Sequence, residues 1–189
     1  MSHIKIVPYD NNWPTDYLKL EQKLKTVLKT MLSDLIIQID HIGSTSVEGL
    51  SAKDIIDIQV TVKNLNTPEL TEKLVTAGFE YNKQANQDNL VGVDDHSPEL
   101  KKLFFRYRYS SDKTAHIHIR EKGRLNQQYP ILFRDYLRSN KTACLSYQNI
   151  KIELATHFEF DSKSYYAIKD PVMDGIYAAA KIWKCGFNE

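Results

Sequence analysis

The sequence predicts an α+β or α/β fold, with a core of strands and helices that is followed by a helical extension at the C-terminal end. Three observations predict it. Apolar residues recur every three or four positions over residues 13–31, as on the buried face of a helix. Short segments rich in β-branched and aromatic residues are spread between residues 35 and 120. Beyond about residue 122 the pattern is helical, so strands and helices occupy largely separate parts of the chain.

The predicted strands share short length, β-branched or aromatic residues, and polar turns at their ends. They are expected at residues 35–42, 55–62, 79–82, 103–109 and 115–120. The polar residues 110–114 between the last two strands suit a hairpin connection. The longer polar segment 84–99 contains glycine, proline and several acidic residues, and we expect it to form a loop.

The predicted helices are recognised by their ends. Residues 68–77 are expected to form a helix, because Thr67 suits the N-cap and Pro68 the first helical position. Gly78 suits the residue after its end. The helical tail is expected to contain three helices, the last of them interrupted near Pro171. Their expected bounds are residues 130–138, 142–157 and 164–184.

The composition is that of an ordinary globular protein. The 189 residues suit one domain, with a core over about residues 1–122 and the helical tail over about residues 123–189. The 25 Lys and Arg nearly balance the 24 Asp and Glu, so no strong field attracts nucleic acid or an anionic membrane. No apolar run approaches the ~20 residues of a membrane span. We therefore expect neither nucleic acid nor a membrane as a partner.

The cysteines and the N-terminus point to the cytoplasm. Cys144 and Cys185 lie far apart, and neither has His or Cys neighbours at the spacing of a metal site. The N-terminal residues lack the continuous apolar segment of a signal peptide. We expect reduced thiols in a cytoplasmic protein, and we keep a homodimer among the expected partners.

The segment His41 to Val60 carries the strongest functional signal. A predicted strand ends in Gly43-Ser44, and Asp57 lies thirteen residues after Ser44, inside the next predicted strand. Nucleotidyltransferases hold a triphosphate and its metal ion with a Gly-Ser turn followed at this distance by a strand aspartate. The pattern therefore predicts a nucleotide site that the turn and the aspartate share.

The phosphate-binding end of this site would be the turn. Gly43 permits a tight bend and a close approach of the ligand to the backbone. Ser44 offers a hydroxyl, and the backbone N–H groups of Ser44 and Thr45 suit phosphate oxygens. Lys53 could add positive charge. The alternative is that Gly-Ser-Thr is a turn and nothing more, because short motifs often match by chance.

The metal-binding end would be Asp57. A carboxylate among β-branched residues is costly when buried alone, so a cation or an ion-pair partner is expected beside it. A two-metal site needs further hard oxygen ligands, and the position two residues on, which shares the strand face, is Gln59. An amide oxygen can bind a metal ion but brings no charge. A structural ion pair is the alternative interpretation of Asp57.

His116 and His118 alternate on a predicted strand, so both imidazoles project from one face. They could bind a transition metal or share acid–base work. The histidine-triad hydrolases continue this pattern with a third histidine, where this chain has Arg120. Half-buried, hydrogen-bonded histidines are the alternative. Arg106, on the preceding strand, is a candidate for binding phosphate, although a solvated surface arginine has the same pattern.

Several blocks of sequence, taken in order, resemble the GrpB family, also called UPF0157. These blocks are V-P-Y-D-N-N-W-P, H-I-G-S-T-S-V-E-G-L-S-A-K-D-I-I-D-I, A-H-I-H-I, L-F-R-D-Y-L-R and A-A-K-I-W. The resemblance covers nearly the whole chain, and the family is grouped with the nucleotidyltransferase superfamily. This chain departs from the family's usual pattern at Glu48 and Asp54.

The resemblance implies a nucleotidyltransferase-like core on a small mixed sheet. It implies that Gly43 and Ser44 take the phosphate position and that Asp57 is the first metal carboxylate. His118 would lie near the superfamily's third carboxylate position, whereas the second acid is replaced here by Gln59. A divalent ion, Mg²⁺ or Mn²⁺, and a nucleotide or another phosphate-bearing small molecule are the implied ligands.

Three functions remain open at this point. The first is a nucleotidyltransferase, in which Asp57, helped by Gln59, His116 and His118, holds the metal ion and catalyses transfer to an acceptor. The second is a binding domain for a nucleotide, a phosphate compound or a protein, in which catalysis has been lost. The third is a phosphohydrolase that uses His116 and His118.

Overall fold

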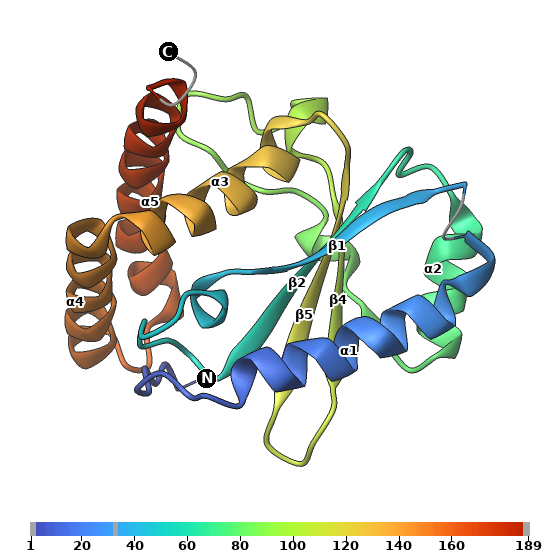
Figure 1. Ribbon diagram of the computed structural model, residues 1–189, viewed down its shortest axis with the longest axis horizontal. Helices are drawn as coiled ribbons and strands as arrows, with labels where there is room; N and C mark the ends of the chain where they lie inside the picture. The colour runs from blue at the N-terminus through green and yellow to red at the C-terminus, as the bar shows by residue number, and fades with distance from the viewer. Residues whose placement is uncertain (1–2, 32–33, 187–189) are drawn as a thin grey trace.

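The computed structural model describes residues 3–31 and 34–186. Among these residues, five strands form one mixed sheet in the order β1-β2-β5-β4-β3 (Figure 1). β2 and β5 run parallel, and the other neighbouring strands are antiparallel. The predicted α+β fold with a small mixed sheet is confirmed. The strands are β1 (Ile36–Ile42), β2 (Ile55–Val62), β3 (Glu80–Tyr81), β4 (Leu103–Arg108) and β5 (Thr114–Glu121).

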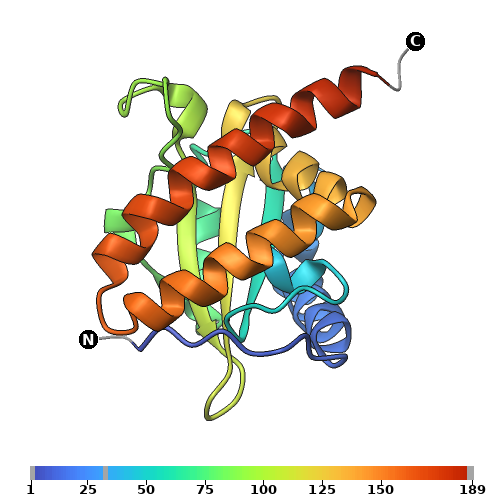
Figure 2. The same ribbon diagram turned by 90° about the vertical axis from the view of Figure 1, so that its left-hand side faces the viewer.

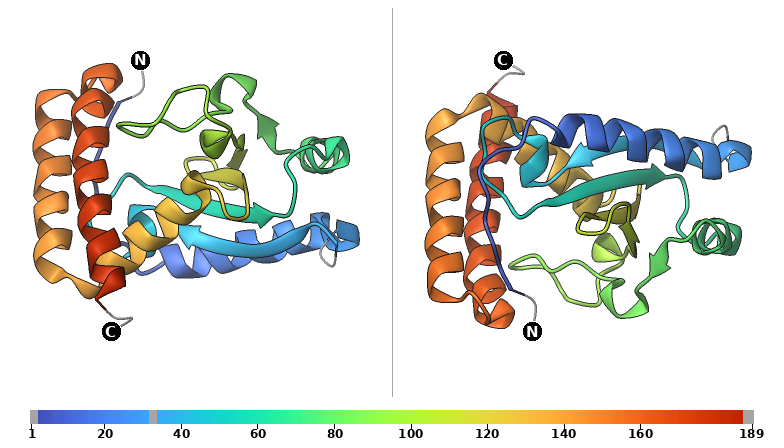
Figure 3. Two further views of the ribbon diagram at one scale, coloured as in Figure 1. Left: turned by 90° about the horizontal axis from the view of Figure 1, so that it is seen from above. Right: turned by 90° about the horizontal axis from the view of Figure 1, so that it is seen from below.

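The described residues also form helices that surround the sheet. Figure 2 shows α4 and α5 side by side, crossing the strands obliquely. In Figure 3 these two helices stand at one end of the molecule and α2 at the other. None of the described helices is both long and apolar enough to cross a membrane. The helices are α1 (Trp13–Val27), α2 (Pro68–Thr76), α3 (Leu125–Ser139), α4 (Lys141–His157) and α5 (Ser162–Cys185).

Alternation along β2 and β5 gives the sheet two different faces. Ile58 of β2 and Ile117 of β5 belong to the apolar core on the side of α1 and α2. Their sequence neighbours point the opposite way, and Asp57, His116 and His118 line a cavity on the side of α3, α4 and α5. The apolar face holds the strands in register, and that register positions the polar side chains.

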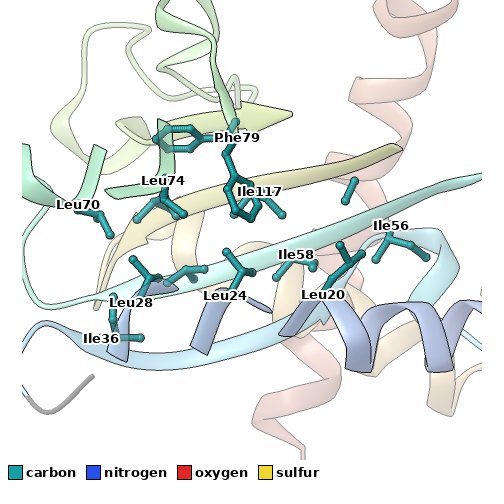
Figure 4. Close-up of a cluster of buried hydrophobic side chains, with 14 of the residues drawn as sticks. Leu20, Leu24, Leu28, Ile36, Ile56, Ile58, Leu70, Leu74, Phe79 and Ile117 are labelled. Carbon is teal, nitrogen blue, oxygen red and sulfur yellow. The ribbon is translucent and has the colours of Figure 1, made fainter. Parts of the chain in front are cut away.

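The main core lies between the sheet and α1 and α2 (Figure 4). Leu24 of α1 and Leu74 of α2 are fully buried against the strands. Burying a leucine stabilises the fold by roughly 1.5–3 kcal/mol. A second cluster joins the turn after β1 to the helical tail through Val47, Leu50 and Phe133, among others. Because of this packing, the proposed phosphate turn is attached to both parts of the chain.

The helical tail differs from the sequence prediction in two places. α3 begins at Leu125, five residues before the predicted start, so Pro130 lies inside the helix. The prediction placed Pro130 at the first helical position, whereas it is the sixth residue of α3, where it removes one backbone hydrogen bond and the helix continues through it. α5 continues through Pro171 as one helix rather than breaking there. The remaining predicted strands and helices agree with the structure to within two residues, apart from the first helix.

That first helix ends at Val27, and a short 3₁₀ turn spans Lys29–Met31. The predicted loop over residues 84–99 is confirmed, with 3₁₀ turns at Lys83–Ala85 and Pro98–Leu100 near its ends. It bridges β3 and β4 on the same side of the sheet as the cavity.

Candidate functional site

The polar face of the sheet opens into a cavity of about 560 Å³. Its walls come from the turn after β1, from β2, β4 and β5, from the loop between β3 and β4, and from the three C-terminal helices. Most of the site residues expected from the sequence line this one cavity. They are Gly43, Ser44, Thr45, Lys53, Asp57, Arg106, His116 and His118.

Gly43 and Asp57 are in direct contact. Their closeness follows from the pairing of β1 with β2, which places Ile42 opposite Asp57. Gly43 has φ = 70°, and a Cβ atom built there would lie 2.5 Å from Asp57 Oδ2. Both the backbone conformation and the missing side chain are therefore required. The Gly-Ser turn and the strand aspartate form one continuous surface.

Asp57, His116 and His118 form a compact cluster. Parallel pairing of β2 with β5 puts Asp57 beside His116, and His118 is the next residue on the same face. Asp57 Oδ1 lies 3.5 Å from His116 Nδ1 and 3.5 Å from His118 Nε2. Burial alone raises the pKa of Asp57, but hydrogen bonds and charge from the two histidines outweigh burial and hold its pKa well below the ordinary range. Asp57 is thus an anion at neutral pH.

Arg120 fixes the tautomer of His118. Burial lowers the pKa of His118 to about 4, so its imidazole is neutral at pH 7. Arg120 Nη2 lies 3.3 Å from His118 Nδ1. Because an arginine can only donate, Nδ1 must accept, and the imidazole proton is on Nε2, which faces Asp57.

The cluster fits a divalent metal ion in part. The three ligand atoms lie within 4.8 Å of one another. The 3.5 Å separations are long for hydrogen bonds, but they approach the about 3.3 Å between ligands of a tetrahedral zinc ion with bonds of about 2.0–2.1 Å. To hold an octahedral ion with the same bond lengths, the side chains would close to separations of about 2.9 Å. Asp57 can bind an ion as it stands, and His116 can join it once the Nδ1 atom that faces Asp57 has given up its proton. His118 joins them only when its Nε2 proton is lost.

Gln59 lies apart from this cluster. It is fully buried on β2, and its side-chain oxygen accepts a hydrogen bond from Arg120 Nη1 at 2.8 Å. Its side-chain nitrogen donates to the carbonyl oxygen of Gln127 at 2.9 Å. The amide therefore connects β2 to β5 and α3. To act as a metal ligand, as the sequence predicts, the side-chain oxygen of Gln59 would have to lose its hydrogen bond to Arg120.

A lysine that the sequence interpretation did not single out reaches the Gly-Ser turn. Lys151 of α4 donates to Ser44 Oγ at 3.0 Å and to the carbonyl oxygen of Ser51 at 2.6 Å. Burial lowers its pKa to about 7, assisted by the charges of Lys169 and Lys53. No carboxylate among the described residues forms a salt bridge with Lys151. The turn thus carries a buried cation without a matching anion.

The rest of the cavity wall is aromatic and cationic. Lys53 donates to Tyr166 of α5 at 2.5 Å, and its ammonium lies 4.6 Å from the centre of that ring. Tyr129 of α3 and Phe104 of β4 also line the cavity. Arg106 also lines the cavity, and it is exposed. The wall therefore offers flat rings and positive charge, which suit a nucleobase and its phosphates.

Other polar residues of the motif serve the fold. Asp54 accepts a hydrogen bond from the buried indole of Trp13 at 2.7 Å. His41 is buried and pairs with Thr45 Oγ1 at 3.0 Å. Arg138 of α3 donates to the carbonyl oxygen of Ser46. The last two contacts hold the turn between β1 and α3.

The family of the chain follows from a family model. The model described as GrpB protein matches residues 3–179. The chain belongs to the GrpB family. Among solved structures, the conserved protein GrpB from Enterococcus faecalis is similar to this chain with a TM-score of 0.75 and 27% sequence identity, over 95% of this chain and 99% of that one. The predicted family membership is confirmed.

Curated relatives include longer proteins. A protein named dephospho-CoA kinase from Mycobacterium tuberculosis strain H37Rv is 32% identical over 95% of this chain but only 46% of its own length. The UPF0157 protein YqkA of Bacillus subtilis is 27% identical over 98% of this chain and 49% of its own length. This GrpB-family chain thus spans about half the length of these relatives. It lacks the G-x-x-x-x-G-K-[ST] phosphate loop of many kinases.

Proposed function

We propose that this GrpB-family chain binds a nucleoside triphosphate together with a divalent metal ion, and transfers the nucleotidyl group to a small-molecule acceptor. An oxygen of the acceptor forms a bond to the α-phosphorus, the bond between the α- and β-phosphates breaks, and pyrophosphate leaves. The observation that carries the proposal is the contact between Gly43 and Asp57, which both line one cavity. A phosphate group seated on the glycine turn is thereby adjacent to the carboxylate that would hold the metal ion.

The turn supplies the phosphate end. Ser44 offers its hydroxyl and backbone N–H, and Lys151 stands 3.0 Å from that hydroxyl. Bringing a phosphate to Lys151 provides the counter-charge that the buried ammonium lacks, and restores its ordinary protonation. Lys53 adds a second cation on the same side of the cavity. These groups position the phosphate chain and offset its charge.

The metal end uses Asp57 and His116. A bound divalent ion would neutralise charge on the phosphate that is attacked. Asp57 supplies the anion that holds the ion, and His118 keeps the carboxylate oriented through its Nε2–H group. Positioning and charge neutralisation are the main contributions a protein makes to this class of reaction.

A binding domain without catalysis is the second candidate. The observation that favours it is the bond between Arg120 and the side-chain oxygen of Gln59, at the position where a second metal carboxylate was expected. Such a domain would keep the turn and Lys151 but bind nucleotides without a metal ion.

Calorimetric titration with ATP separates these candidates. The transferase should bind ATP in the presence of Mn²⁺ and lose at least tenfold in affinity when Mn²⁺ is omitted or Asp57→Asn is introduced. Asp112→Asn, which makes the same charge change on the exposed β4–β5 hairpin, should leave binding unchanged. Binding that is indifferent to Mn²⁺ and to Asp57→Asn identifies the binding domain. An absence of binding under all conditions rejects both.

A further inference from the structure

Beside the Asp57 cluster, a cradle of hydrogen-bond donors holds one of the chain's own carboxylates, that of Asp88. Arg120 donates two hydrogen bonds to this carboxylate, from Nε to Oδ2 at 2.9 Å and from Nη2 to Oδ1 at 3.2 Å. Lys102 Nζ lies 2.5 Å from Oδ1, and Asn126 Nδ2 donates to Oδ2 at 3.1 Å. We call Arg120, Lys102 and Asn126 the carboxylate cradle.

The cradle belongs to the same cavity as the predicted site. All three of its residues line that cavity, and Arg120 also contacts His118. Arg120 is 4% exposed, and the side chain of Lys102 is 10% exposed. One buried cation, Arg120, and one half-buried cation, Lys102, therefore face a single carboxylate. Their charges outweigh the effect of burial and hold the pKa of Asp88 well below its ordinary range.

The backbone of Asp88 is fixed, whereas its side chain has a way out. Its N–H donates to the carbonyl oxygen of Leu100 at 2.9 Å, and Lys102 N–H donates to that of Asn86 at 2.9 Å. The side chain of Asp88 is 22% exposed, which is more than either cation. Rotation about its side-chain bonds would therefore empty the cradle while these backbone bonds stay in place.

The cradle also contains an acceptor that Asp88 cannot satisfy. Asn126 is 4% exposed, and its Oδ1 atom is buried and has no hydrogen-bond partner among the residues that the structure describes. The orientation of this amide is fixed, because Nδ2 donates both to Asp88 and to the carbonyl oxygen of Lys101. An ionised carboxylate has no donor to offer Oδ1. A ligand with a hydroxyl or amine beside its carboxylate would satisfy it.

We propose that the carboxylate cradle binds the carboxylate of a small hydroxy acid or amino acid, and that Asp88 occupies it until this ligand arrives. Arg120 and Lys102 take the carboxylate, and Asn126 Oδ1 accepts a hydrogen bond from the neighbouring hydroxyl or amine. Naming this ligand as the acceptor of a nucleotidyl group rests on the proposed function, but the binding site itself does not.

Chemical rescue of an Asp88→Ala variant tests the site. Its thermal unfolding is measured in sodium chloride, sodium propionate and sodium L-lactate at equal ionic strength, without nucleotide or metal. Propionate and lactate differ by one hydroxyl. In Asp88→Ala we expect Tm to rise by about 3 °C or more in 0.1 M propionate relative to chloride, and further in lactate. In the unmodified protein and in Asp95→Ala, a change on the same loop at an exposed position, lactate must first displace Asp88, so the rise should be smaller than in Asp88→Ala. No rise in lactate in these two proteins would overturn the displacement of Asp88.

Each outcome decides the matter. If Asp88→Ala melts at the same temperature in all three salts, the cradle admits no outside carboxylate and the proposal is overturned. A rise in propionate that lactate does not exceed overturns the role given to Asn126. If the variant is unfolded in chloride, recovery of its helical circular dichroism in lactate supports the proposal, and no recovery rejects it. Because nucleotide is absent, failure here is distinct from failure of the ATP titration.

Discussion

Replacing Lys151 with methionine should stabilise the fold while weakening phosphate binding. Lys151 is 3% exposed, and burial lowers its pKa from 10.5 to about 7. At pH 7 this shift costs at most about 4 kcal/mol of folding free energy, because the unfolded chain keeps the proton that the folded chain half releases. Methionine removes that cost but leaves the carbonyl oxygen of Ser51 without its donor, a loss of about 1–3 kcal/mol. We expect a net gain of about 1–3 kcal/mol.

The pH dependence provides the signature of this effect. Between pH 7 and 10.5 the unfolded state binds more protons at Lys151 than the folded state does. The free energy of unfolding of the unmodified protein should therefore rise with pH in this window, by up to about 1.4 kcal/mol per pH unit. Lys151→Met should lack this contribution, so its advantage should shrink as the pH rises.

Urea unfolding at pH 7 and pH 9 measures both quantities. Lys141→Met, at an exposed position on the same helix, is the matched control and should change stability by less than about 0.5 kcal/mol. ATP titration of Lys151→Met should show at least a tenfold loss of affinity. Destabilisation at pH 7, or a pH dependence equal to that of the unmodified protein, would refute the reasoning that the ammonium is buried without an anion.

Two further substitutions test the turn and the cluster. Gly43→Ala should destabilise the fold by about 2–4 kcal/mol in urea unfolding, because it adds a clash with Asp57 to the strain of a positive φ. Gly49→Ala has similar φ but open space around it, so it should cost only about 1–2 kcal/mol; equal losses would mean that the turn moves away freely. His116→Ala should weaken Mn²⁺ binding, followed by electron paramagnetic resonance, at least tenfold, whereas the exposed loop variant His96→Ala should not. Equal affinities in the two variants would remove His116 from the metal site.

Local patterns were sufficient to predict the strands and the two faces of the sheet, and the family resemblance added that the sheet is small and mixed. The period of two along β2 separates Ile58 from Asp57, and the same period along β5 separates Ile117 from His118. The nearness of Gly43 to Asp57 was also readable, because a strand that ends in a turn and pairs with the next strand brings the two together.

The remaining parts of the cavity depend on contacts between distant segments. Lys151 looks like any lysine on a helix, and only the packing of α4 against the turn brings it to Ser44. Asp88 lies in a polar loop, and the residues that donate hydrogen bonds to it, Arg120 and Lys102, lie in two other segments of the chain. The spacing of residues in the sequence does not predict such contacts between distant segments. The start of α3 was missed because proline is favoured at the first position of a helix, whereas Pro130 lies inside this helix, which begins at Leu125.

The central claim is that the glycine turn and Asp57 hold one ligand between them. A crystal structure of the protein soaked with a non-hydrolysable ATP analogue and Mn²⁺ tests it most directly. We predict an anomalous Mn²⁺ peak about 2.0–2.3 Å from an Asp57 carboxylate oxygen, with phosphate oxygens bound to Ser44 and Lys151. A nucleotide bound elsewhere, or one whose phosphates avoid the turn while the metal ion leaves Asp57 free, would contradict the account.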